Sequence, residues 1–304
     1  MKEPLVSIIT PSYNQGQFVE DCILSIRNQI YQNFEHIIID GGSSDNTREI
    51  LKKYEGTYNM RWISKPDDGM YDAINKGFKM SKGDILAYLN CDDFYLPWSI
   101  SVAVKNLNTH DIIFGDSIIC SENMTDAYLH FTPPFIKTYY YSVGVIVQPT
   151  VFFRRELFEK VGSFDHQAFK LIADYDYWLR CAFAGYKPKK IYEFLAIQRD
   201  HEITQRSTRK ELIKQEFIHL RFRYSENSWF KIKTNRIFMH MYWRFALLTY
   251  KIAWLPFWHE IKSSKIVNLS WARYLLEITP MSIRKYLVSN SYCDLESIYN
   301  LKVK

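Results

Sequence analysis

The sequence predicts an α/β fold in which helices flank a mostly parallel β-sheet. From the start to about residue 110, apolar runs of strand length alternate with segments in which apolar residues recur at the helical period. This alternation is typical of parallel sheets, whose strands are connected by helices. A chain of 304 residues, of which 47% are hydrophobic, can also bury the large core that such a sheet needs.

The regular part of this pattern contains four strands and four helices. Apolar runs predict strands over residues 5–10, 34–40, 60–64 and 84–89. The segments after them predict helices over residues 17–29, 45–54, 71–80 and 97–106. Ser43, Ser44 or Asp45 can cap the second helix, and Pro97 suits the first turn of the fourth helix.

Beyond residue 108 the predicted elements become shorter and less regular. A short helix is predicted over residues 155–161, and a longer one begins near Ala173 and stops at Gly185. One or two strands follow through residues 187–200, and we expect mainly helix beyond Thr208. No internal repeat or low-complexity linker interrupts the chain.

Each of the four predicted strands ends in a polar cluster. The clusters are TPSYN at residues 10–14, DGG at 40–42, KPDDG at 65–69 and NCDD at 90–93. The carboxyl ends of parallel strands lie on one edge of a sheet, where open α/β sheets bind their ligands. We therefore expect the four clusters to converge on one crevice.

Cysteine usage and the N-terminus bear on the compartment. The five cysteines are odd in number, widely spaced and without a C-x-x-C pair, which predicts reduced thiols rather than disulfides or a zinc site. The N-terminus enters a predicted strand without the apolar region or cleavage site of a signal peptide. Both features predict a cytoplasmic protein.

The C-terminal part differs from the rest in charge and in aromatic content. Residues 1–198 carry 20 Lys and Arg against 24 Asp and Glu, whereas residues 199–304 carry 19 against 9. Within the basic part, His240, Arg244 and Lys251 share nearly one helical face of the apolar and aromatic segment 237–258. This pattern favours a helix lying on an anionic membrane surface. The alternative is a helix packed on the first domain or in a homo-oligomer; no nucleic-acid recognition motif accompanies the charge.

The adjacent carboxylates Asp92 and Asp93 are candidate metal ligands. Two neighbouring carboxylates repel each other unless a cation lies beside them, and an incomplete oxygen shell suits Mg²⁺ or Mn²⁺ that also holds substrate phosphates. A solvated turn or a cap for the helix at Pro97 is the structural alternative. The position of the pair at the end of a strand, beside three other polar strand ends, favours the metal.

The sequence indicates neither a P-loop nor a dinucleotide-binding site. Neither a G-x-x-x-x-G-K-[ST] loop nor a G-x-G-x-x-G turn follows the first strand. Asp40 can instead accept hydrogen bonds from a base or a ribose, flanked by the turn at residues 11–14. A turn-forming role of Asp40 before Gly41 and Gly42 remains the alternative.

Three segments in order resemble the motifs of the family-two inverting glycosyltransferases of bacterial polysaccharide type, which have the GT-A fold. They are residues 6–47 (VSIITPSYNQGQFVEDCILSIRNQIYQNFEHIIIDGGSSDNT), 64–93 (SKPDDGMYDAINKGFKMSKGDILAYLNCDD) and 162–180 (GSFDHQAFKLIADYDYWLR). The resemblance spans about residues 4–207, and the order of several motifs makes it specific. It implies a nucleotide-diphosphate sugar donor bound with Mg²⁺ or Mn²⁺, and sugar transfer with inversion.

The resemblance also implies roles for individual residues. The nucleoside would contact the segment Pro11, Ser12, Tyr13 and Asn14 together with Asp40, while Asp68 and Gly69 would line the same pocket. NCDD occupies the place of the family's D-x-D element, so Asp92 would face the donor and the metal, with Asp93 beside it. Asn90 stands where the family often has aspartate; it can hydrogen-bond but supplies no negative charge.

The catalytic base maps to Asp174 in the segment ADYDYW. An acceptor hydroxyl must lose its proton as it attacks, which a positioned carboxylate accelerates by about 10² to 10⁴-fold. Asp176 is the competing candidate, and a helix cap is the structural alternative for Asp174. In the later segment QRDHEITQRS, His201 would approach the diphosphate or the metal, with Arg199 nearby.

These inferences predict a metal-assisted, membrane-associated glycosyltransferase that acts on a lipid-linked or growing glycan. Its catalytic domain would cover residues 1–207, with a nucleotide-sugar half at 1–110 and an acceptor and base half at 111–207. Residues 208–304 would form a helical region for membrane association or oligomerisation. The alternatives are a sugar-nucleotide nucleotidyltransferase and a non-catalytic nucleotide-sugar-binding protein. A nucleotidyltransferase would carry a Gly-rich, basic loop after its first strand, and the segment TPSYNQGQ at that place is not such a loop.

Overall fold

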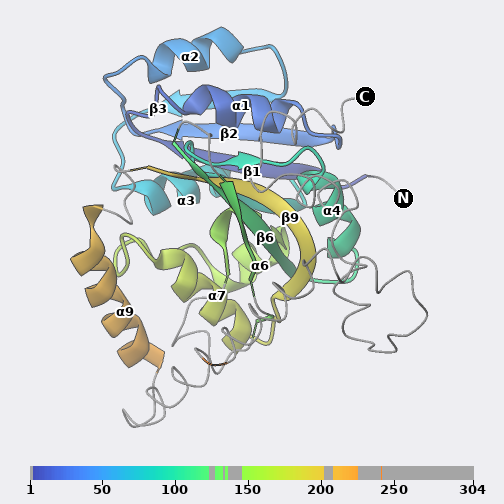
Figure 1. The fold of residues 1–304 in the computed structure, drawn as a ribbon, viewed down its shortest axis with the longest axis vertical. Helices are drawn as coiled ribbons and strands as arrows, with labels where there is room; N and C mark the ends of the chain where they lie inside the picture. The colour runs from blue at the N-terminus through green and yellow to red at the C-terminus, as the bar shows by residue number, and fades with distance from the viewer. Residues whose placement is uncertain are drawn as a thin grey trace.

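The computed structural model contains one mixed β-sheet with helices on both faces (Figure 1). It describes residues 3–122, 127–132, 134–135, 146–201, 208–224 and 241. The predicted helix at residues 237–258, with His240, Arg244 and Lys251, lies outside the described residues. In the described part of the chain, no helix is long and apolar enough to cross a bilayer.

The elements follow the predicted alternation in the first half of the chain. The strands there are β1 (Val6–Ser12), β2 (Phe34–Asp40), β3 (Met60–Ser64), β4 (Ile85–Tyr88) and β5 (Phe94–Tyr95). The helices are α1 (Val19–Arg27), α2 (Thr47–Tyr54), α3 (Met70–Met80) and α4 (Ser99–Leu107). The bounds of β2 and β3 are those that the sequence predicts.

The second half completes the sheet and adds helices to one face. Its strands are β6 (Ile112–Ser121), β7 (Ala127–His130), β8 (Phe152–Arg154) and β9 (Lys189–Asp200). Its helices are the 3₁₀ turn η1 (Gln148–Thr150), α6 (Arg155–Val161), α7 (Ala173–Phe183) and α9 (Lys210–Tyr224). The short helix predicted at 155–161 is confirmed, and the strand predicted through 187–200 is the single strand β9.

The sheet is parallel in one half and mixed in the other. Its strand order is β3-β2-β1-β4-β8-β6-β9-β5, with β7 paired to β6. β1 to β4 run parallel, whereas β8 runs antiparallel to both β4 and β6, and β5 runs antiparallel to β9. The prediction of parallel strands therefore holds for β1 to β4, and the short strands β5, β7 and β8 add the antiparallel pairs.

Alternating side chains of the central strands build a core on each face of the sheet. On β1, Ile9 joins the cluster that contains α3 and α7, while Val6 and Ile8 join the cluster that contains α1 and α4. Successive strand residues point to opposite faces, which is why both faces are apolar and both are covered. Figure 1 shows α1 and α2 on one side of the sheet and α3, α7 and α9 on the other.

Helix α3 packs unusually close to the sheet at Gly77. A Cβ atom added there would lie 2.3 Å from Cγ2 of Ile9 on β1. Only glycine fits at this distance, since real Cβ atoms do not approach that closely. The close contact holds α3, whose first turn carries Tyr71, against β1.

His36 is a buried histidine that gives stability a pH dependence. Its Nε2 lies 2.9 Å from Thr10 Oγ1 and its Nδ1 lies 2.6 Å from Tyr58 Oη. Complete burial lowers the pKa of His36 from 6.5 to about 3, because desolvation penalises the charged ring. Between these two pH values the unfolded chain binds the proton that the folded chain excludes.

We expect the free energy of unfolding to fall as the pH drops from 6.5 towards 3. The contribution of His36 is fully present above pH 6.5 and is lost by up to about 1.4 kcal/mol per pH unit below it. Urea titrations at pH 7, 5.5 and 4.5 on the wild type and on His36→Gln measure this term, since glutamine keeps a donor and an acceptor but does not titrate. Identical slopes against pH in the two proteins would refute the assignment.

Candidate active site

The carboxyl ends of β1, β2 and β3 form one polar row. In the register of the sheet, Ser12 lies beside Asp40, and Asp40 lies beside Ser64. The sequence places Pro11 and Ser12 in a turn, and this is corrected here: both belong to β1, where they pair with Ile39 and Asp40. The strand extends because β2 offers it two further residues of backbone partners.

Asp40 fixes the loop that follows β2. Its side chain is fully buried, and its Oδ2 accepts hydrogen bonds from Ser64 Oγ at 2.6 Å and from Ser43 N at 2.9 Å. Gly42 N donates to the same oxygen at 3.2 Å, and Ser43 Oγ donates to Oδ1. The turn-forming role of Asp40, which the sequence leaves open, is therefore present, and its contact with a base or a ribose stays a prediction.

Asn14 connects the β1 loop to the β2 loop. It adopts a positive φ of 52°, its backbone N donates to Ser43 Oγ at 2.7 Å, and its Oδ1 accepts from Ser44 N at 2.9 Å. Asparagine tolerates this left-handed conformation better than most residues. The preceding Tyr13 is 62% exposed, so its ring lies open to solvent at the edge of the sheet.

The loop after β3 places Asp67, rather than Asp68, towards the polar row. A Cβ atom added at Gly41 would lie 2.9 Å from Oδ2 of Asp67 and 3.3 Å from Cδ2 of Tyr13. Partial burial raises the pKa of Asp67. Asp68 is exposed, and its backbone N donates to Asp72 Oδ2 at 3.0 Å. The resemblance implies roles for Asp68 and Gly69 and none for Asp67, because either of two adjacent carboxylates fits the motif.

The loop after β4 places an acidic side chain beside a histidine. Asp92 Oδ2 lies 3.2 Å from Nε2 of His201, which directly follows β9. The His201 ring is almost fully buried, lies 4.7 Å from the Phe18 ring, and has no hydrogen-bond partner at Nδ1 among the described residues. The resemblance implies that His201 approaches the diphosphate or the metal, and the structure places it beside Asp92.

Asp93 and Arg199 are directed into the protein. Asp93 is buried, and its Oδ1 accepts from the backbone N of Arg199 at 3.3 Å. The Arg199 guanidinium pairs with Asp21 at 2.5 Å and lies 4.9 Å from the centre of the Phe18 ring. The charge of Arg199 thus lies against Asp21 and the Phe18 ring, and its contact with the donor stays a prediction.

Asn90 lies between these groups and η1. Its Nδ2 contacts Oε1 of Gln148 at 3.5 Å, and Gln148 in turn donates from Nε2 to the Tyr88 carbonyl at 2.8 Å. Asn90 Oδ1 is buried without a hydrogen-bond partner in the described part of the chain. Gln148 was not among the predicted residues, since an isolated glutamine carries no recognisable spacing.

The arrangement fits a divalent cation that shares its ligands with a substrate. In the described ranges, no group of three or more His, Cys, Asp or Glu side chains could hold a metal by itself. Mg²⁺ commonly uses one or two carboxylates and completes its shell with water and substrate phosphates. Asp92, with the nearby nitrogen of His201 and the unpartnered oxygen of Asn90, offers such an incomplete shell.

Asp174 lies in the first turn of α7 and is hydrogen-bonded to α3. Its side chain is buried, and Tyr71 Oη donates to its Oδ1 at 2.7 Å. Burial and the neighbouring carboxylate raise the pKa of Tyr71 well above 10, so the phenol remains a donor. The contact connects Asp174 to the helix that begins directly after Gly69.

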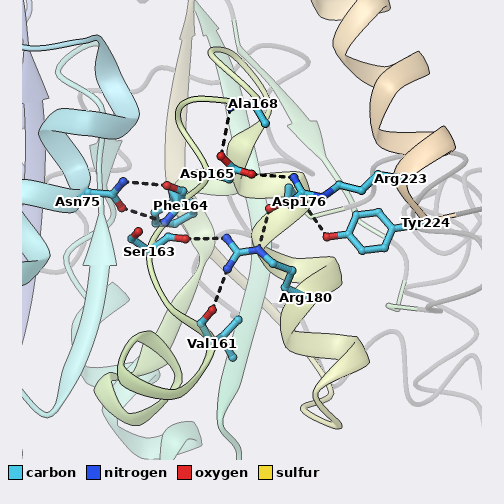
Figure 2. A network of polar contacts seen from close by, with 10 residues as sticks. All are labelled: Asn75, Val161, Ser163, Phe164, Asp165, Ala168, Asp176, Arg180, Arg223 and Tyr224. Atoms are coloured by element: carbon cyan, nitrogen blue, oxygen red, sulfur yellow. Dashed lines mark hydrogen bonds and ion pairs between the residues drawn. The ribbon is translucent and has the colours of Figure 1, made fainter.

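Asp176, the competing candidate, is engaged in a structural network (Figure 2). Its Oδ2 accepts from Arg180 Nε at 2.8 Å, and its Oδ1 accepts from Tyr224 Oη at 2.6 Å. Arg180 also donates to the carbonyls of Val161 and Ser163. Because its two oxygens are used inside the protein, Asp176 is poorly suited to take a proton from a substrate.

The polar row, the Asp92–His201 pair and Asp174 belong to one edge of the sheet. Leu89 N donates to the Ile9 carbonyl at 2.9 Å, and Cys91 Sγ donates to the Pro11 carbonyl at 3.4 Å, so the β1 and β4 ends lie side by side. The Tyr71 ring, which holds Asp174, lies 6.5 Å from the Tyr88 ring at the end of β4. The edge therefore brings together the hydrogen-bonding groups of the polar row, the Asp92 carboxylate, which suits a cation, and the Asp174 carboxylate, which Tyr71 holds in place.

Comparisons with known proteins identify the family. The model of the family "Glycosyl transferase family 2" matches residues 7–162, half of the chain. A PGL/p-HBAD biosynthesis glycosyltransferase of Mycobacterium bovis is 29% identical over 187 residues, which cover 60% of this chain and 71% of the relative. An uncharacterized glycosyltransferase of Rickettsia typhi is 30% identical over 192 residues, 58% of each chain.

Two solved structures share the fold at low sequence identity. S. aureus TarS 1–349 in complex with UDP-GlcNAc has a TM-score of 0.55 at 15% identity, covering 76% of this chain and 70% of that one. Mannosyltransferase PcManGT from Pyrobaculum calidifontis, in complex with GDP-Man and Mn²⁺, has a TM-score of 0.56 at 17% identity, covering 75% and 67%. The chain belongs to glycosyl transferase family 2 and is a glycosyltransferase with a GT-A-type fold.

Proposed function

We propose that the protein is an inverting glycosyltransferase that moves a sugar from a nucleotide-diphosphate donor to a hydroxyl of a lipid-linked or growing glycan. The observation that carries this proposal is the buried Asp174 carboxylate, held by Tyr71 on the same edge of the sheet as the Asp92–His201 pair. Asp174 suits the proton of the acceptor, and the Asp92–His201 pair suits a cation that accompanies the phosphates of the donor. A nucleotidyltransferase or a pure binding protein needs no held carboxylate of this kind.

The base acts on the acceptor. The acceptor oxygen forms a bond to the anomeric carbon as the bond from that carbon to the diphosphate breaks, and the hydroxyl proton passes to Asp174. Because the oxygen attacks opposite the leaving group, the anomeric configuration inverts. Tyr71 donates to Asp174 Oδ1 at 2.7 Å, which stabilises the ionised carboxylate and fixes its orientation.

The donor's diphosphate would lie beside Asp92, Asp93 and His201. When bound there, Mg²⁺ or Mn²⁺ supplies positive charge to the departing diphosphate. Asp92 would hold the cation directly, and His201 Nε2 fixes the Asp92 carboxylate at 3.2 Å. Asp93 accepts from the backbone of Arg199, and this contact anchors the loop that presents Asp92.

The nucleoside would occupy the polar row at the ends of β1 to β3. Tyr13 offers an exposed aromatic ring, and Asp40 and Asp67 offer acceptors beside it. Ser12, Asn14, Asp68 and Gly69 complete the loops around this pocket. PcManGT and TarS were solved with GDP-Man and UDP-GlcNAc, which makes GDP- and UDP-sugars the first donors to test.

The acceptor and the location of the enzyme are a further part of the proposal. The catalytic unit, which the sequence predicts over residues 1–207, extends through α9, and the rest of the predicted region 208–304 associates with an anionic membrane surface on its cytoplasmic side or with a second copy of the chain. The excess of basic and aromatic residues after residue 208 supports this division. Contacts of α9 with α7 argue for extending the catalytic unit to Tyr224.

A donor screen tests the proposed function. We expect one or a few UDP- or GDP-sugars to raise the Tm of the full chain in the presence of Mn²⁺ or Mg²⁺, because a ligand that binds only the folded state stabilises it by mass action. At a concentration of 100 times Kd the gain is about 2.7 kcal/mol. EDTA should remove the shift. The absence of any metal-dependent shift across the panel would refute the proposal.

A further inference from the structure

A carboxylate on α9 holds the segment that leads into the proposed base. Glu216 is almost fully buried, and its Oε1 accepts from the backbone N of Lys170 at 2.7 Å. Its Oε2 accepts from the backbone N of Leu171 at 3.0 Å and of Ile172 at 3.1 Å. One side chain thus satisfies three consecutive N–H groups directly before α7, in whose first turn Asp174 lies.

The local sequence explains why an acceptor from another helix is needed. Ile172 is the N-cap residue of α7, and Lys170 and Leu171 precede it, so the N–H groups of these three residues have no carbonyl partner within the helix. N–H groups left without partners at a buried helix start destabilise it, and a negative charge is favourable there. Glu216 supplies both the acceptors and the charge from 44 residues further along the chain.

Two further contacts fix α9 against α7. Leu220, one turn after Glu216, is fully buried in the core cluster that contains α7. At the end of α9, Tyr224 Oη donates to Asp176 Oδ1 at 2.6 Å, and Arg223 Nη1 donates to Asp165 Oδ2 at 2.8 Å (Figure 2). Glu216 therefore projects from a helix that is itself held in place, so its carboxylate can define the position of residues 170–172.

We infer that Glu216 is a positioning residue, which sets the place of Asp174 by holding the backbone of residues 170–172. The inference rests on the proposed role of Asp174 as the base. Helix α9 thereby contributes to catalysis, although it lies beyond the segment of the chain that resembles the family. Residues in this role act on the rate rather than on donor affinity, because they control the geometry of the reacting groups.

The test compares Glu216→Ala and Glu216→Asp with Glu211→Ala, a matched control on the same helix. Glu211 is exposed, and its Oε2 lies 3.6 Å from Lys214 Nζ. With the donor chosen by its thermal shift, we expect Glu216→Ala to lower kcat about 10- to 100-fold with KM for the donor unchanged. Glu216→Asp should recover part of the rate, and Glu211→Ala should match the wild type. Hydrogen exchange of the amides of residues 170–172 should quicken in Glu216→Ala alone.

A double-mutant cycle distinguishes an effect of Glu216 that acts through Asp174 from a general loss of structure. If Glu216 acts through Asp174, Glu216→Ala should not slow the residual transfer of Asp174→Asn any further. An equal slowing in both backgrounds, or a wild-type kcat in folded Glu216→Ala, would overturn the inference while leaving the proposed function intact. A wild type that turns over no nucleotide sugar would instead refute the proposed function, and with it this inference.

Discussion

Replacing Asp174 with asparagine should lower kcat by about 10² to 10⁴-fold and leave the Kd of the donor unchanged. Asparagine keeps the size and polarity of the side chain but cannot take a proton from the acceptor hydroxyl. The Tyr71 hydroxyl can still donate to the amide oxygen, so the first turn of α7 keeps its contact with α3. Initial rates of nucleoside diphosphate release, together with calorimetric titration of the donor, measure the two quantities separately.

Asp176→Asn is the matched control, since Asp176 is two residues away and also buried. It weakens contacts with Arg180 and Tyr224, so we expect a lower Tm but a kcat within a few-fold of the wild type below that temperature. The opposite pattern, with Asp176→Asn inactive and Asp174→Asn active, would move the base to Asp176. Equal activity in both variants would show that the catalytic base does not lie on α7.

Replacing Asp92 with alanine should lower kcat/KM by about 100-fold or more and abolish the metal dependence of donor binding. The variant lacks the carboxylate proposed to hold the cation, whose charge stabilises the departing diphosphate by several kcal/mol. His201 also loses its contact at 3.2 Å. Titration of MnCl₂ at fixed donor, followed by thermal shift and by initial rate, measures the effect.

Glu159→Gln on α6 is the control for loss of one negative charge, because Glu159 is exposed and lies outside the proposed site. It should titrate with MnCl₂ as the wild type does. A wild-type metal dependence in Asp92→Ala would show that the cation is held elsewhere. Loss of donor binding by Asp92→Ala even in the absence of metal would assign Asp92 to direct contact with the donor.

The sequence was sufficient for elements with strong local patterns. β2, β3 and α6 have their predicted bounds because apolar runs, helical period and turn residues agree there. The antiparallel pairing of β8 with β4 was not predictable, because the three residues of β8 carry no directional signal. The continuation of β1 through Pro11 was not predictable either, because it depends on pairing with the neighbouring strand β2.

In the site, residues within motifs could be predicted, and contacts between distant segments could not. The motif order pointed to Asp92 and His201, which the structure joins across 109 positions. It could not separate Asp67 from Asp68, because adjacent residues on a loop face different ways. The resemblance placed Arg199 near the donor, but its pairing with Asp21 across 178 positions has no sequence signal, and neither have the hydrogen bonds from Glu216 to residues 170–172.

The anomeric configuration of the product tests the central claim most directly. Proton NMR can follow the anomeric signal of the donor chosen by thermal shift, in a reaction with metal, the full chain and a glycan or lipid-linked acceptor. We expect the donor signal to be replaced by a product signal of opposite anomeric configuration, and neither EDTA-treated enzyme nor Asp174→Asn should produce it at a comparable rate. A product that keeps the configuration of the donor would contradict the single displacement with Asp174 as base.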